Sequence, residues 1–93
     1  MIKRGKPTKD GQVKVTFTLP AQEPQGPVSL VGSFDSWEPS AHPLKPRSNG
    51  LRSAVVTVPA SSTLHFRYLG EGGVWFDDTD ADEVRHDGGR LHL

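Results

Sequence analysis

The chain has 93 residues, 11 Lys or Arg against 11 Asp or Glu, a formal net charge of zero and no cysteine. This length leaves room for one domain, which buries only about 60–65% of the surface of its unfolded chain. The lack of cysteine excludes disulfide bonds and thiolate chemistry and favours a reducing compartment. No apolar run approaches the roughly 20 residues that span a bilayer, and the basic N-terminus lacks the apolar core of a signal peptide. We therefore expect a cytoplasmic protein with no membrane partner.

Charge is distributed unevenly along the chain. Residues 1–52 contain eight Lys or Arg and four Asp or Glu, whereas residues 53–93 contain three and seven. Because much of the positive excess lies near the N-terminus, we expect residues 1–10 to form a basic flexible arm and residues 11–93 to form the single domain. No aromatic residue stands among the five cations of the first fourteen residues. Since nucleic-acid sites combine basic charge with stacking side chains, nucleic acid is not an expected partner.

The first half of the chain predicts two strands separated by turns. Apolar residues at 13, 15, 17 and 19 alternate with Lys14, Thr16 and Thr18, which is typical of a strand with one buried face. Residues 20–27 are rich in proline and form a connection. Residues 28–31 are a short apolar run that ends at Gly32. Residues 39–50 contain three prolines and an Asn-Gly pair, which indicates a loop that runs into a turn.

The second half of the chain continues the same pattern. Residues 51–58 and 63–69 predict strands, and in the second strand His65, Arg67 and Leu69 share one face. Residues 70–73 (GEGG) indicate a hairpin, residues 74–76 a returning strand, and residues 90–93 a last short strand. No segment shows the 3.6-residue period of a helix. Six or seven short strands with frequent turns favour an all-β sandwich.

The two tryptophans are the first candidates for a binding site. Trp37 follows a polar turn at residues 33–36, and Trp75 lies just past the hairpin. With Val74 and Phe76 expected to point inward, the two-residue period turns Trp75 toward the face that Arg67 also occupies. A tryptophan of a small domain is more often part of the core. Two flat aromatic rings and a guanidinium on one open face, however, suit a sugar, whose C–H groups stack on indole and whose hydroxyls accept hydrogen bonds.

Two segments resemble family-48 carbohydrate-binding modules, including isoamylase N-terminal (early-set) domains and the glycogen-binding domain of AMP-activated protein kinase. In that family a strand is followed by Gly-x-Phe-x-x-Trp and then by Pro-Leu before the next strand. Residues 28–37 (VSLVGSFDSW) carry the first motif, and Pro43-Leu44 follows it. Residues 64–78 (LHFRYLGEGGVWFDD) are similar to the family's hairpin, in which a basic residue and a second tryptophan precede an aspartate. The resemblance covers roughly residues 13–93.

The resemblance implies an immunoglobulin-like β-sandwich of six to eight short, mostly antiparallel strands that binds α-1,4-glucans such as glycogen or starch. By the same resemblance Trp37, Arg67 and Trp75 line the glucan site. The loop before the last strand lacks the asparagine that glucan-binding members usually supply there. Additional carbohydrate contacts are expected from four other residues: His65, Arg85, His86 and Arg90. We expect a monomer whose partners are an α-glucan and, beyond it, a glycogen- or starch-metabolising enzyme.

Neither catalysis nor a metal or other cofactor is expected. The chain has no Gly-x-Ser-x-Gly, no Walker-type loop and no HExxH, and its Asp residues cluster in one loop rather than across a cleft. Residues 78–83 (DTDADE) suggest a calcium loop, but an EF-hand that starts at Asp78 has Glu83 at its sixth position and Gly89 at its twelfth, where glycine and glutamate belong. The four histidines show no close ligand spacing.

A second hypothesis belongs to a different class of function. Under this hypothesis the chain keeps the sandwich fold but has lost affinity for sugar, and it serves as a protein-interaction domain of the early-set type. The missing asparagine and the basic segment from Lys3 to Lys9 favour this alternative. The two hypotheses differ in whether Trp37 is exposed or buried among Phe34 and Leu44.

Overall fold

A computed structural model describes residues 1–22, 26–38, 41–47 and 49–93. Within these residues the chain forms ten strands and two short 3₁₀ turns, η1 and η2. The elements are β1 (Ile2–Arg4), β2 (Gln12–Pro20), β3 (Ser29–Gly32), η1 (Ser33–Asp35), β4 (His42–Pro43), β5 (Lys45–Pro46), β6 (Leu51–Pro59), β7 (Thr63–Leu69), η2 (Glu71–Gly73), β8 (Trp75–Phe76), β9 (Glu83–Arg85) and β10 (Gly88–His92).

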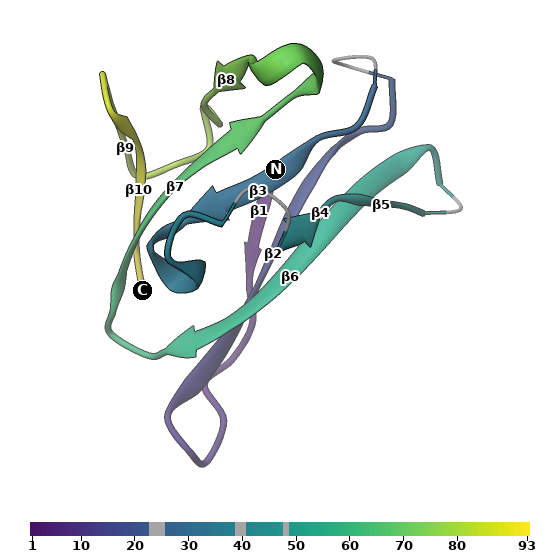
Figure 1. Ribbon diagram of the computed structural model, residues 1–93. Helices are drawn as coiled ribbons and strands as arrows, with labels where there is room; N and C mark the ends of the chain where they lie inside the picture. The colour runs from purple at the N-terminus through teal and green to yellow at the C-terminus, as the bar shows by residue number, and fades with distance from the viewer. Residues whose placement is uncertain (23–25, 39–40, 48) are drawn as a thin grey trace.

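The strands form two antiparallel sheets packed face to face (Figure 1). One sheet has the order β1-β2-β6-β5, and the other has the order β4-β3-β7-β10-β9, with β8 paired to β7. The predicted all-β sandwich is therefore confirmed. The strand count exceeds the expected six to eight because several elements have only two or three residues, too few for a period to show in the sequence.

The four-stranded sheet is built on a long pair of strands, β2 and β6. Val13, Val15 and Phe17 lie opposite Val58, Val56 and Ala54, and these six side chains fill the inner face. The residues between them, which are mostly polar, point outward. This is the alternation that the sequence predicts for residues 13–19, and it arises because successive side chains of a strand leave opposite faces of the sheet.

Part of the expected N-terminal arm belongs to this sheet. Residues 2–4 form β1, which pairs with β2 so that Ile2 lies opposite Phe17 and Lys3 opposite Thr16. Ile2 packs against the core. Three residues give no readable alternation, and the basic composition of residues 1–10 therefore concealed one inward apolar side chain that helps to attach this segment to the sheet.

The six-stranded sheet contributes the inner face of β7. Leu64, Phe66 and Tyr68 are buried, and the ring of Phe66 meets Phe17 of the other sheet edge to face, with centroids 4.9 Å apart. Burial of each large apolar side chain contributes about 1.5–3 kcal/mol, so these contacts hold the two sheets together. The outer face of the same strand is consequently left free for His65, Arg67 and Leu69.

The chain crosses from one sheet to the other between β4 and β5. β4 pairs with β3 in the six-stranded sheet, and β5 pairs with β6 in the four-stranded sheet. Leu44 lies between them, is buried, and donates its backbone N–H to the carbonyl of Val28 at 2.9 Å. The Pro43-Leu44 pair thus brings residues of both sheets together at one edge of the sandwich.

The acidic loop is anchored by one buried carboxylate. Asp78 accepts a hydrogen bond from the hydroxyl of Tyr68 at 2.7 Å and another from the backbone N–H of Asp80 at 2.8 Å. Burial, followed by the hydrogen bond to Asp78, raises the pKa of the Tyr68 phenol far above its usual range. Among the described residues, no three His, Asp or Glu side chains are grouped to hold a metal ion. In the same part of the chain, no helix is long and apolar enough to cross a membrane.

Candidate ligand-binding face

The candidate site is the outer face of β7, which lies between β3 and β10 in the six-stranded sheet. His65, Arg67 and Leu69 alternate with the buried residues of this strand and are each partly exposed. Across the ladder, Arg90 of β10 lies opposite His65, and Trp75 of β8 lies opposite Leu69. Because directly paired residues of a sheet share a face, all of these side chains are on the same side of the sheet.

The turn after β3 carries Trp37 onto this face. A Cβ at Gly32 would lie 2.5 Å from the carbonyl oxygen of His65 and 2.6 Å from the ring of Phe34, so only glycine fits there. The chain then reverses with φ angles of 57° at Ser36 and 61° at Trp37, a region that non-glycine residues seldom occupy. The Trp37 N–H closes the turn on the Gly32 carbonyl at 3.0 Å. The Gly-x-Phe-x-x-Trp spacing therefore has a structural reason in this chain.

Trp37 is not part of the core. Its side chain is 37% exposed, and its ring meets the imidazole of His65 edge to face with centroids 4.8 Å apart. Phe34 is the residue of this turn that packs against the core. The turn is fastened to β7 by the hydroxyl of Ser33, which accepts the backbone N–H of His65 at 3.2 Å.

Trp75 lies at the other end of the same row of side chains. It is 42% exposed, and the guanidinium carbon of Arg67 lies 5.8 Å from the centre of its ring. Arg67 also donates from Nε to Asp77 at 3.2 Å, and this ion pair fixes the guanidinium beside the indole. The expected inward position of Val74 is wrong. Val74 is 60% exposed because it precedes the two-residue strand β8, whereas Phe76 packs against the core as predicted.

Asp87 contacts two further residues of the face. The ring nitrogen Nε2 of His65 donates to the Asp87 carbonyl at 2.9 Å, and Arg90 lies 3.4 Å from the Asp87 carboxylate. The hydrogen bond from Arg90 is the main reason why the pKa of Asp87 lies below its usual range. Arg90, His65, Arg67 and Trp75 thus form a polar and aromatic surface in which the arginines are already paired with carboxylates.

The remaining predicted contacts lie farther from the indoles. Arg85 of β9 is opposite Gly88 of β10, and it pairs with Glu83 at 2.7 Å. A Cβ at Gly88 would lie 2.7 Å from Cγ of Arg67 and 3.0 Å from Nε2 of His65, so this glycine leaves room for both side chains to cross β10. His86 is exposed between β9 and β10, and it makes no hydrogen bond or ring contact with a described residue.

The alternation in the sequence predicts more residues of this face than the tryptophan motifs alone. Trp37, Arg67 and Trp75 share one side of the sheet. The alternation in residues 63–69 predicts the common face of His65 and Arg67, and in the structure His65 contacts Trp37 while Arg67 contacts Trp75. The roles of Asp77 and Asp87 as counter-ions were not predicted. Their only signal in the sequence is that an acidic loop follows a strand with outward cations. A face with two partly exposed indoles and several N–H donors is suited to stack and hydrogen-bond a ring-shaped polyol.

Comparison of the chain with protein-family models, with curated proteins and with solved structures gave no match in any of the three.

Proposed function

We propose that this protein binds α-1,4-glucans on the face formed by Trp37, His65, Arg67 and Trp75 and does not act as a catalyst. The observation that carries the proposal is the placement of two partly exposed indoles at the two ends of one row on β7. From the position of His65 to that of Leu69, where Trp75 pairs, the row extends about 13 Å along the strand. A row of this length can receive more than one sugar ring.

The chemistry of the face fits a neutral polyol. The C–H faces of glucose rings pack on indoles, and the N–H groups of Arg67 and Arg90 donate to hydroxyls. Both arginines are paired with carboxylates, so their positive charges are balanced. The face therefore favours a ligand by its shape and its hydrogen-bonding groups rather than by its charge. An open face excludes little water, so we expect dissociation constants between micromolar and millimolar. These correspond to a free energy of binding of about −4 to −8 kcal/mol.

The test is a titration with maltoheptaose, followed by tryptophan fluorescence and by backbone amide NMR. We expect saturable shifts at residues 65–69 and 75 in the intact protein, and a loss of affinity of about tenfold for Trp37→Ala and for Trp75→Ala. Val55→Ala is the matched control, because Val55 is a similarly exposed apolar residue (43%) on the other sheet. The absence of any indole response at several millimolar ligand would contradict the proposal.

A second candidate function is the docking of a protein partner on the same face, such as a glycogen- or starch-metabolising enzyme. The observation that favours it is the engagement of Arg67 and Arg90 with Asp77 and Asp87, which occupies part of their hydrogen-bonding capacity. The same titration separates the two candidates. A face that ignores maltoheptaose, but whose amides shift when a branching or debranching enzyme is added, supports the docking function.

A further inference from the structure

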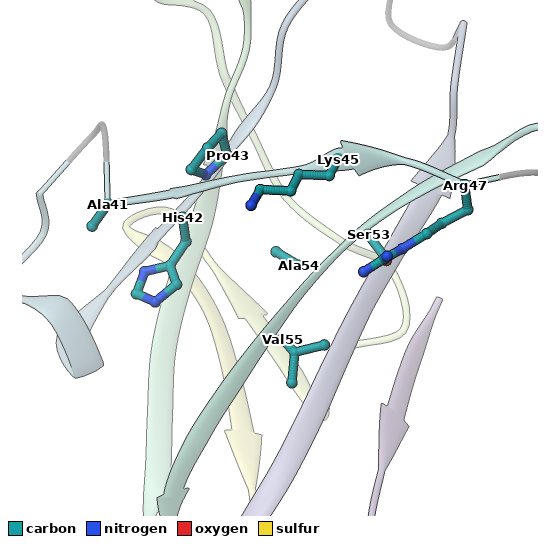
Figure 2. A pocket seen from close by; sticks show the side chains of 8 residues that line it. All are labelled: Ala41, His42, Pro43, Lys45, Arg47, Ser53, Ala54 and Val55. Carbon is teal, nitrogen blue, oxygen red and sulfur yellow. The ribbon is translucent and has the colours of Figure 1, made fainter.

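A hollow with a volume of about 270 Å³ opens at the edge of the sandwich where the chain crosses between the sheets. It is lined by β4, by β5 with the residues next to it, and by β6. The lining residues are Ala41, His42, Pro43, Lys45, Arg47, Ser53, Ala54 and Val55. Figure 2 shows the side chain of Lys45 extending in the direction of His42 and the side chain of Arg47 extending to Ser53. None of the residues of the candidate glucan face lines this hollow.

The polar groups in the hollow are positioned by the ladder between β5 and β6. Lys45 lies opposite Ser53, so their side chains share a face, and Arg47 follows two residues later on the same side. Arg47 donates from Nε to the hydroxyl oxygen of Ser53 at 2.7 Å. Ser53 is only 6% exposed.

This hydrogen bond leaves the site with donors that have no acceptor. Because the Ser53 oxygen accepts from Arg47, its own hydrogen points elsewhere, and no described residue accepts it. The terminal amines of Arg47 and the ammonium of Lys45 likewise make no hydrogen bond with a described residue. Three kinds of donor therefore converge on one hollow: a guanidinium, an ammonium and a nearly buried hydroxyl.

The basic residues of this hollow differ from other arginines of the protein in whether a carboxylate lies beside them. Among the described ion pairs, Arg4, Arg67, Arg85 and Arg90 each lie within 3.4 Å of an aspartate or glutamate. No described carboxylate lies within salt-bridge distance of Lys45 or Arg47. The Ser53 hydroxyl lines the hollow, so it can donate its hydrogen to an oxygen of an anion bound there, and the anion would supply the negative charge that Lys45 and Arg47 lack among the described residues.

We propose that this hollow binds a phosphate monoester. A phosphate has three terminal oxygens in a tetrahedral arrangement and accepts from several directions, which matches three donors of different geometry, whereas a carboxylate has two oxygens in one plane. The volume lies just below the range typical of sites for drug-sized ligands, so the hollow suits a small charged group with part of its carrier. The site does not depend on glucan binding at the β7 face.

The test is an amide NMR titration with inorganic phosphate and with glucose 6-phosphate, at constant ionic strength and a pH of about 7.5, where a phosphate monoester is mainly a dianion. We expect saturable shifts of the amides of Lys45, Arg47 and residues 53–55 with dissociation constants of about a millimolar or below. In the double variant Lys45→Ala/Arg47→Ala, affinity should fall at least about tenfold. Ser53→Ala, which removes only the hydroxyl, should weaken binding about fivefold.

The matched control is the double variant Lys3→Ala/Lys14→Ala. It removes the same charge from the outer face of the same sheet, where Lys3 and Lys14 lie opposite Thr16 and Thr57. The control should keep affinity within about twofold. Three results would overturn the proposal: shifts that do not saturate by about 20 mM, an equal loss in the control variant, or acetate binding as tightly as phosphate. Trp75→Ala should leave phosphate binding unchanged. The phosphate titration therefore tests this site separately from the glucan proposal, and failure of one proposal would not imply failure of the other.

Discussion

The outer faces of the two sheets are built by the same alternation but carry different chemistry. On the six-stranded sheet, aromatic rings and arginines lie side by side, and Arg67, Arg85 and Arg90 are each paired with a carboxylate. On the four-stranded sheet, the outward residues include lysines, threonines, Ser53 and Val55, with no described carboxylate near Lys45 or Arg47.

The difference comes mainly from one acidic segment, which includes two loops and β9. The acidic segment from Asp77 to Asp87 lies beside the six-stranded sheet and supplies its counter-charges (Figure 1). The same segment also reaches the four-stranded sheet, where Asp82 pairs with Arg4 of β1, but no described carboxylate lies within salt-bridge distance of Lys45 or Arg47. A neutral polyol therefore suits the first face and an anion suits the second, although a strand pattern alone would make the two faces equivalent.

The largest effect is expected when the turn that carries Trp37 is broken. Gly32→Ala places a methyl group 2.5 Å from a backbone carbonyl, so we expect a loss of about 2–3 kcal/mol in the free energy of unfolding, measured by urea denaturation. Gly70→Ala is the control. Its new Cβ would meet its nearest neighbour at 3.4 Å, and the loss should stay below about 1 kcal/mol. Equal losses in the two variants would contradict the close approach at Gly32.

A somewhat smaller effect is expected at the anchor of the acidic loop. Tyr68→Phe removes the hydroxyl that donates to buried Asp78, and it should cost about 1–3 kcal/mol.

The pH dependence of stability checks the same contact. Since the pKa of Tyr68 is raised in the folded state, its contribution is fully present below its unfolded pKa of about 10 and is lost as the pH rises above that value. Urea midpoints between pH 7 and about 11 should therefore fall at the alkaline end for the intact protein, and this fall should be smaller in Tyr68→Phe. The same alkaline slope in both proteins would argue against the buried pair.

A smaller effect on binding tests the guanidinium of the β7 face. Arg67→Lys keeps the positive charge but loses the planar group beside Trp75 and the Nε donor to Asp77. Maltoheptaose affinity should fall about two- to fivefold, with phosphate binding unchanged. If the variant binds maltoheptaose as tightly as the intact protein, the guanidinium of Arg67 does not contribute to glucan binding.

The smallest effect is expected in acid, and it should distinguish the two sheets. Asp82, Glu83 and Asp87 are exposed carboxylates whose pKa values lie below their usual range. The main causes are the His92 backbone N–H for Asp82, Arg85 for Glu83 and Arg90 for Asp87. Their contribution is present above the unfolded pKa of about 4 and is lost as the pH falls through the lower folded values. Amides of β9 and β10 should lose hydrogen-exchange protection at a higher pH than those of β2 and β6, and simultaneous loss would contradict this.

The sequence predicts the long strands well because their buried faces repeat every second residue. Val13, Val15 and Phe17 identify β2, and Leu64 and Phe66 identify β7. The elements of two or three residues are not predictable in this way, since a strand such as β4 or β5 is defined by its partner across the ladder rather than by its own residues.

The same distinction applies to the sites. The common face of Trp75 and Arg67 follows from period two within a hairpin, which is local information. The hollow next to β5 depends on Leu44, which carries the chain from one sheet to the other and brings Lys45 beside Ser53. The Lys-Pro-Arg segment at residues 45–47 signals only a basic loop, and no sequence rule places it against a serine eight residues away.

The crossing at Leu44 has a mechanical consequence. Since β4 belongs to one sheet and β5 to the other, sliding the sheets past each other would break ladder pairs at Leu30 or Ser53 and expose the buried Leu44. Shear between layers is a common route by which ligands at separate sites influence each other. The crossing at Leu44 opposes such shear because it joins the two sheets. We therefore expect a glucan and a phosphate to occupy the protein at the same time without altering each other's affinity.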